Sequence, residues 1–154
     1  MDSRIETYKH IQVVQRYLGS VIRNLIGRSE KHDQSKLVSP EVEVFDEFTE
    51  KLASSVYLSP EYQANLAAMK PALDHHYAAN DHHPQHFENG IRGMTLHALL
   101  EMMSDWMAAV QRHKNGGDIR KSIEDNQKRF GYGDELKQIF LNTVAQIEAD
   151  AAQG

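Results

Sequence analysis

The sequence predicts an all-α protein, and three observations support this prediction. Apolar residues recur at helical steps of three and four along almost the whole chain. No segment alternates apolar and polar residues around a tight turn, as a β-hairpin would. Two Ser-Pro-Glu sequences, at positions 39–41 and 59–61, have the residue order of helix starts. We therefore expect one domain over residues 1–154, a bundle of about six or seven helices.

The first helix is expected over residues 3–25, with Gly27 ending it. His10 lies on its apolar stripe, one turn before the first valines, and we expect this face to be buried. A short helical segment over residues 28–36 follows and contains the sequence KHDQSK. The stripe consists of Val13, Val14, Tyr17, Val21 and Leu25.

The two Ser-Pro-Glu sequences predict the next helices. In each, the serine is the expected N-cap, the proline the first helical residue, and the glutamate a favourable charge at the positive end of the helix dipole. The second of these helices is expected to reach residue 79, with a kink at Pro71, and a loop then begins at Asn80. The residues concerned are Ser39, Pro40 and Glu41, and Ser59, Pro60 and Glu61.

Three further helices complete the prediction, over residues 95–113, 118–129 and 134–151. The first of them is the most apolar helix of the chain, and the sequence KNGGD ends it. Its predicted core face consists of Leu96, Leu99, Leu100, Met103, Met107 and Val110.

Composition excludes several classes of protein. A net charge of −5 over 154 residues argues against an extended nucleic-acid surface. No apolar segment approaches the roughly 20 residues of a membrane span, and there are no cysteines for disulfides, thiolate zinc sites or nucleophiles. The N-terminal sequence MDSRIETYKH has no apolar signal-peptide core, so we expect a cytoplasmic protein without membrane contact.

Four residues that are far apart in the sequence have the side chains of a metal site. They are His10, the adjacent pair His32 and Asp33, and Asp105 within LLEMMSDWMAAV. Structural interpretations remain open for each position. His10 can be a core histidine and Asp33 a turn or cap residue. Asp105 falls opposite Met103 on a helical wheel, so it can also lie on a solvated face.

The order of these residues resembles the signature of the HD metal-dependent phosphohydrolase superfamily. In that superfamily a histidine, a His-Asp pair and a distant aspartate meet at one divalent cation within a helical bundle. The motifs KHDQSK, HHYAANDHHP and EMMSDW, in that order, resemble more closely a small family of uncharacterised bacterial and phage proteins with HD-like character. The resemblance implies a single HD-like helical domain with His10, His32, Asp33 and Asp105 as metal ligands.

The residue types favour certain metals. Neutral imidazoles and carboxylates suit Mn, Fe, Co, Ni or Zn better than Mg, which prefers oxygen ligands. A divalent transition metal lowers the pKa of bound water and neutralises phosphate charge. The resemblance implies hydrolysis of a small-molecule phosphate ester, with a nucleotide or deoxynucleotide as the expected substrate, and it also allows a homodimer.

Five of the nine histidines lie within LDHHYAANDHHPQHF. His75 and His76 are about 100° apart on a helix, so both cannot easily face one ion. His76 continues an apolar stripe and is expected to point inward, whereas His75 follows a stripe of alanines. His82 and His83 lie in the loop beyond. These four residues are expected to hold a second metal, contact substrate or be exposed. His86, His97 and His113 are expected at the surface.

One position departs from the resemblance. Nucleotidase-like HD enzymes commonly have a glutamate three residues after the HD aspartate, where this chain has Lys36. An ammonium cannot act as a carboxylate base, but it can bind phosphate or simply be exposed. Glu101, one turn before Asp105, or one of the clustered histidines is a candidate for proton transfer.

Two other functions remain open. The domain can be a non-enzymatic metal- or nucleotide-binding module, which the replacement at Lys36 favours, or an iron oxygenase of the kind that some HD relatives form with a two-metal site. A helical structural protein with incidental histidines is the third alternative, and the ordered motifs argue against it.

Overall fold

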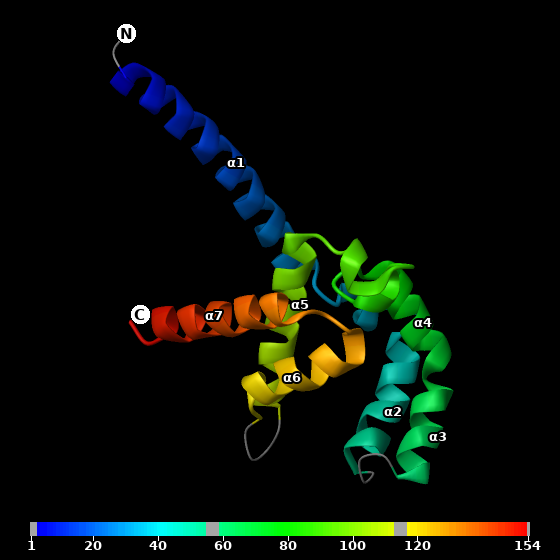
Figure 1. The fold of residues 1–154 in the computed structure, drawn as a ribbon. Coiled ribbons are helices and arrows are strands. Elements are labelled where there is room, and N and C mark those ends of the chain that lie inside the picture. Colours follow the sequence, from blue (N-terminus) through cyan, green and yellow to red (C-terminus); the bar gives the residue numbers. More distant parts are fainter. Residues whose placement is uncertain (1–2, 55–58, 113–116, 154) are drawn as a thin grey trace. The chain divides into compact units, whose positions relative to one another are not determined.

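The computed structural model describes residues 3–54, 59–112 and 117–153. Within these ranges the chain forms seven α-helices and three short 3-10 helices, without a strand (Figure 1). The predicted all-α class is confirmed. The contacts divide the chain into two compact units, which we call unit 1 (Met1–His76) and unit 2 (Tyr77–Gly154). The expectation of one domain over residues 1–154 stays a prediction.

Unit 1 consists of four helices and one 3-10 helix. They are α1 (Ser3–Lys31), η1 (Gln34–Leu37), α2 (Val42–Ser54), α3 (Pro60–Ala68) and the beginning of α4 (Lys70–Ala79). α2 packs against α3 and against η1. The buried residues of this unit include the apolar side chains of Met69 and Ala72, together with the polar side chains of Glu41 and His76.

The expected end of the first helix is wrong. α1 continues through Gly27 and ends at Lys31, because Asp33, with φ of 55°, leaves the helical conformation instead. Asp is one of the few residues that adopt this left-handed conformation at low cost. The expected burial of the apolar stripe is also wrong, since none of residues 3–31, all of which are described, is buried.

The starts of the two Ser-Pro-Glu helices differ. Ser59 caps α3 as predicted, because its hydroxyl accepts a hydrogen bond from the backbone N–H of Tyr62 at 3.1 Å. The expected cap at Ser39 is wrong, since residues 39–41 form a turn and α2 begins at Val42. Glu41 therefore does not stand exposed at a helix end but points into unit 1.

The predicted kink near Pro71 is a full break between two helices. α3 ends at Ala68 with Met69 as its C-cap, and α4 begins at Lys70. Pro71 thus lies in the first turn of α4, where its missing N–H costs no hydrogen bond.

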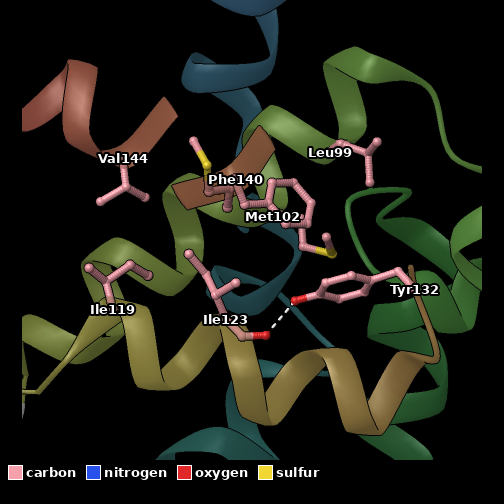
Figure 2. Packing of buried hydrophobic residues seen from close by; sticks show 8 residues of the cluster. Leu99, Met102, Ile119, Ile123, Tyr132, Phe140 and Val144 are labelled. Atoms are coloured by element: carbon pink, nitrogen blue, oxygen red, sulfur yellow. Dashed lines mark hydrogen bonds between the residues drawn. The ribbon is translucent and has the colours of Figure 1, made fainter. Parts of the chain in front are cut away.

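Unit 2 contains the continuous hydrophobic core. After the end of α4 come η2 (Pro84–His86), η3 (Gly90–Gly93), α5 (Leu96–Gln111), α6 (Ile119–Phe130) and α7 (Asp134–Ala151). α6 packs against both α5 and α7. Side chains of these helices and of the turn between α6 and α7 form one buried cluster (Figure 2). It consists of Leu99, Met102, Met103, Ile119, Ile123, Tyr132, Phe140 and Val144.

The described helix bounds of unit 2 lie within two residues of the predicted ones. Thr95 caps α5 and Asp118 caps α6, while α7 has the predicted bounds. Gly131, with φ of 68°, ends α6 in the left-handed conformation that glycine adopts readily. α5 reaches Gln111, and the expected end at His113 lies outside the described residues. Among the described helices, none is both long and apolar enough to cross a membrane.

Candidate metal-binding site

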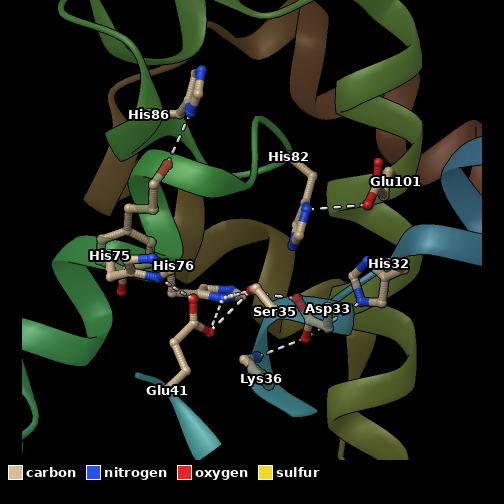
Figure 3. A network of polar contacts seen from close by, with 11 residues as sticks. His32, Asp33, Ser35, Lys36, Glu41, His75, His76, His82, His86 and Glu101 are labelled. Carbon is tan, nitrogen blue, oxygen red and sulfur yellow. Dashed lines mark hydrogen bonds and ion pairs between the residues drawn. The ribbon is translucent and has the colours of Figure 1, made fainter. Parts of the chain in front are cut away.

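The end of α1 brings two predicted ligands together. The backbone N–H of His32 still donates to the carbonyl of Arg28 at 2.8 Å, and the left-handed Asp33 then turns the chain into η1. His32 Nε2 lies 3.6 Å from Asp33 Oδ2, and Lys36 Nζ lies 2.6 Å from the same oxygen (Figure 3). The KHDQSK motif therefore gathers an imidazole, a carboxylate and an ammonium at one turn.

A second carboxylate of unit 1, that of Glu41, is fully buried. It accepts hydrogen bonds from His75 Nδ1 at 2.7 Å, His76 Nδ1 at 2.9 Å and Ser35 Oγ at 3.0 Å (Figure 3). Burial alone would raise the pKa of the Glu41 carboxyl, but the hydrogen bonds from His75, Ser35 and His76 and the charge of His76 lower it below its ordinary value. Glu41 is therefore ionised at neutral pH despite its burial.

The ionised Glu41 fixes the tautomer of His76. A carboxylate only accepts hydrogen bonds, so His76 Nδ1 must carry a proton. The opposite ring nitrogen, Nε2, lies 3.3 Å from Asp33 Oδ1. If the imidazole is neutral, its Nε2 lone pair faces a carboxylate oxygen, and two acceptors at this distance require either a proton or a cation between them.

This pair of atoms fits a bound transition metal. An oxygen and a nitrogen that bind one ion at about 2.1 Å each lie roughly 3.0–3.4 Å apart. Asp33 Oδ1 and His76 Nε2 have that separation, and the two residues offer ligand atoms within 4.8 Å of each other. The hydrogen bond from His76 to Glu41 is the arrangement that orients metal-binding histidines in proteins. Unit 1 thus holds imidazole and carboxylate groups that could bind a cation.

Unit 2 repeats the pairing of a buried histidine with a glutamate. His82 is 1% exposed, and its Nδ1 lies 3.1 Å from Glu101 Oε1 (Figure 3). A proton on Nδ1 leaves Nε2 as the metal-binding nitrogen. Ligand atoms of Asp105 and of His83 each lie within 4.8 Å of one of His82. Asp105 is partly buried, so the face of α5 that it occupies is not fully solvated.

Among the predicted ligands of unit 1, His10 lies far from His32 and Asp33. It is exposed on α1, and 22 residues of nearly continuous helix separate it from His32, which corresponds to about 33 Å at 1.5 Å per residue. The expectation that His10 and His32 of one chain bind the same ion is therefore wrong. It depended on a first helix that ended at Gly27, whereas α1 continues to Lys31.

The structure distinguishes the clustered histidines. His76 points inward as predicted, whereas the side chain of His75 is 48% exposed while its Nδ1 contacts Glu41. His86 is exposed, as expected, and contacts the backbone oxygen of Tyr77 at 2.9 Å (Figure 3). The Nε2 atom of His97 is buried, so a surface position describes it only in part. His113 lies outside the described residues.

Two residues of the site were missed by the sequence analysis. Ser35 lies inside the KHDQSK motif, and this position was the available signal. Glu41 had the pattern of a helix-start residue, and no local pattern indicates that it turns inward to meet residues 34 and 35 positions later. Its role becomes visible only when α4 is placed beside the turn that precedes α2.

No curated protein and no solved structure matches the chain. Residues 1–151 match the profile of a family described as "Family of unknown function (DUF5662)". This match covers nearly the whole chain, including the turn after α1 and the histidines of α4. The chain therefore belongs to the DUF5662 family.

Proposed function

We propose that this protein is a divalent-metal-dependent phosphohydrolase and that Asp33 and His76 are central ligands of its metal. The observation that supports this most is the contact between His76 Nε2 and Asp33 Oδ1, with His76 Nδ1 held by the buried Glu41. That geometry presents two metal-binding atoms with their orientation already fixed. His32 Nε2, at the other Asp33 oxygen, is the third proposed ligand.

The proposed reaction is hydrolysis of a phosphate ester. Water adds to phosphorus, the ester P–O bond breaks, and the products are an alcohol and inorganic phosphate. A bound transition metal supplies activated water at neutral pH and neutralises phosphate charge. The preference for a nucleotide or deoxynucleotide rests on the resemblance to HD enzymes. No protein nucleophile is needed.

Lys36 is the proposed phosphate-binding residue. Its side chain is 31% exposed, and its Nζ ion-pairs with Asp33 Oδ2 at 2.6 Å. A phosphate oxygen can replace this partner, because an ammonium binds oxyanions as a point charge. If Lys36 bound phosphate instead, the Asp33 carboxylate would no longer be neutralised by the ammonium and would bind a metal more strongly.

The ligand set of unit 2 is proposed to bind a second ion or the substrate. His82, oriented by Glu101, is its central residue, with Asp105 and His83 as further donors. Because Glu101 contacts His82, its expected role in proton transfer would pass through that imidazole. One or two ions per chain are consistent with this proposal.

The second candidate function is a metal-binding module without turnover. The contact between Lys36 and Asp33 favours it, because an ammonium already neutralises the carboxylate that would bind the metal. Lys36 also occupies the position where nucleotidase-like HD enzymes commonly have a glutamate. A module of this kind would bind metal or nucleotide and release no phosphate.

A phosphate-release assay separates these functions. Protein purified without a histidine tag is incubated with nucleoside and deoxynucleoside phosphates in the presence of Mn²⁺, Co²⁺ or Ni²⁺. We expect release with at least one ester, and a loss for Asp33→Asn beyond the roughly 100-fold that changes near metal ligands cause. Asp46→Asn, an exposed change in the same unit, is the matched control. Metal binding without release from any ester would reject the enzyme in favour of the module.

A further inference from the structure

The longest helix of the chain exposes an apolar face. α1 spans 29 residues, about 43 Å, and along it apolar side chains recur at alternating steps of three and four. We call these residues and their apolar neighbours the α1 face. The spaced residues are Ile11, Val14, Leu18, Val21 and Leu25, and the neighbours are Tyr8, Ile22 and Ile26.

The exposure of the α1 face is large. Leu18 is 56% and Ile22 57% exposed, and Tyr8 reaches 68%. With on the order of 100 Å² of accessible surface for each exposed side chain, the face presents roughly 700 Å². Monomeric proteins rarely leave a contiguous apolar patch of this size in water. It approaches the roughly 800 Å² that each partner contributes to a stable interface.

The pattern of the α1 face indicates another helix of the same kind as its partner. Alternating steps of three and four keep one seam along a helix and are typical of helices that pair by knobs-into-holes packing. The charged residues Lys9, Arg16 and Arg23 lie on the opposite side of the helix, so no like charges meet in the seam. The same face on a second chain has matching length and chemistry.

We propose that two copies of this protein associate through their α1 faces. The main alternative is an anionic membrane surface, because α1 itself has six basic and two acidic residues, and vesicle binding tests this alternative separately. This association does not depend on the proposed hydrolase activity. It is a property of residues 8–26, whereas the candidate metal site of unit 1 begins at His32.

The test is the oligomeric state measured by sedimentation velocity over a range of concentrations. We expect the wild-type protein to sediment as a dimer and Leu18→Glu to weaken dimerisation by at least about 30-fold, because two carboxylates would be placed in the seam. Ser20→Glu, on the opposite side of α1, is the matched control and should remain dimeric. Circular dichroism checks that each variant keeps its helix content, and Val14→Gln serves if Leu18→Glu does not fold.

Three results would overturn the proposal. One is a wild-type protein that stays monomeric at high micromolar concentration, which would mean that the α1 face is covered within its own chain. Another is a dimer that Leu18→Glu and Val14→Gln leave unchanged. The third is a monomer that binds phosphatidylserine vesicles through the α1 face, with binding lost in Leu18→Glu and retained in Ser20→Glu.

Discussion

The buried carboxylate of Glu41 determines the chemistry of the histidine beside it. A buried charge is tolerated only where hydrogen bonds replace its hydration, and Glu41 receives these from Ser35, His75 and His76. One consequence is the fixed proton on His76 Nδ1. The other is that His76 Nε2 faces Asp33 with its lone pair or with a second proton. A single glutamate thus couples the turn before α2 to the ligand on α4.

Replacing Glu41 by glutamine tests this coupling. The amide cannot accept hydrogen bonds at both former oxygen positions, so His76 loses its fixed orientation. We expect Glu41→Gln to weaken binding of Co²⁺ by about 10- to 100-fold, measured by isothermal titration calorimetry on protein whose circular dichroism is unchanged. Glu43→Gln, exposed on the first turn of α2, should bind as the wild type does. Equal affinities for all three proteins would contradict the role of Glu41.

The hydroxyl of Tyr132 gives unit 2 a pH-dependent stability. It donates a hydrogen bond to the carbonyl of Ile123 inside the core (Figure 2), and burial raises the pKa of Tyr132 from 10.0 to about 12. The folded state favours the neutral form of Tyr132. The contribution of this hydroxyl to the free energy of unfolding is therefore complete below pH 10.0 and is lost as the pH rises through about 12.

We therefore expect the free energy of unfolding to fall above pH 10.0 more steeply in the wild type than in Tyr132→Phe. At neutral pH the variant should be less stable by about 1 kcal/mol, because the hydrogen bond from the tyrosine hydroxyl to the carbonyl of Ile123 is lost. Urea unfolding at several pH values measures both effects. Parallel curves for the two proteins above pH 10.0 would contradict the buried position of the hydroxyl.

At the scale of the elements, most helices follow from local signals and two boundaries do not. The cap at Ser59 is where the sequence predicts it, and the helices expected to start at Thr95 and Asp118 begin one residue later with those residues as caps. Side-chain capping depends on residues three positions apart or fewer, so a local pattern can indicate it. The predicted end of α1 was wrong because glycine can occupy a helix interior at modest cost. Whether a helix ends at Gly27 depends on whether the residues after it are more stable in the helical conformation, and no local pattern specifies this.

Two glycine substitutions test this account of the helix ends. Among the described residues, no atom lies within 4 Å of a Cβ placed on Gly27, which is helical. Gly27→Ala should therefore stabilise the protein by about 0.5–1 kcal/mol. Gly131→Ala should destabilise it, because φ there is 68°. Thermal unfolding measures both. A loss of stability in Gly27→Ala would instead indicate that the helix ends at this glycine.

For the whole molecule, each unit has its own buried histidine paired with a glutamate. The sequence predicts His76 and His82 as candidates and Asp33 as a ligand, because ordered motifs are visible in the chain. It does not predict Glu41, whose contact joins residues 34 and 35 positions apart. The prediction for His10 was wrong for a related reason, because the distance between His10 and His32 depends on where α1 ends. Binding of one ion by His32, Asp33 and Asp105 together stays a prediction.

Metal binding should raise the stability of the folded chain. A ligand that binds only the folded state stabilises it by about 2.7 kcal/mol at 100 times its dissociation constant, which corresponds to an increase of roughly 5–10 °C in the melting temperature for a chain of this size. We expect this shift with Ni²⁺ or Co²⁺ after treatment with a chelator, and a smaller one with Mg²⁺. Asp33→Asn should lose the shift and Asp46→Asn should keep it. Equal shifts in both variants would contradict a site at Asp33.

The most direct test of the central claim is calorimetric titration of untagged, metal-free protein with Ni²⁺. We predict saturable binding at one or two ions per chain, weakened by more than about 100-fold in His76→Ala and unchanged in His86→Ala, whose side chain is exposed. Wild-type protein that takes up no ion would contradict the account. So would a folded His76→Ala variant that binds as tightly as the wild type.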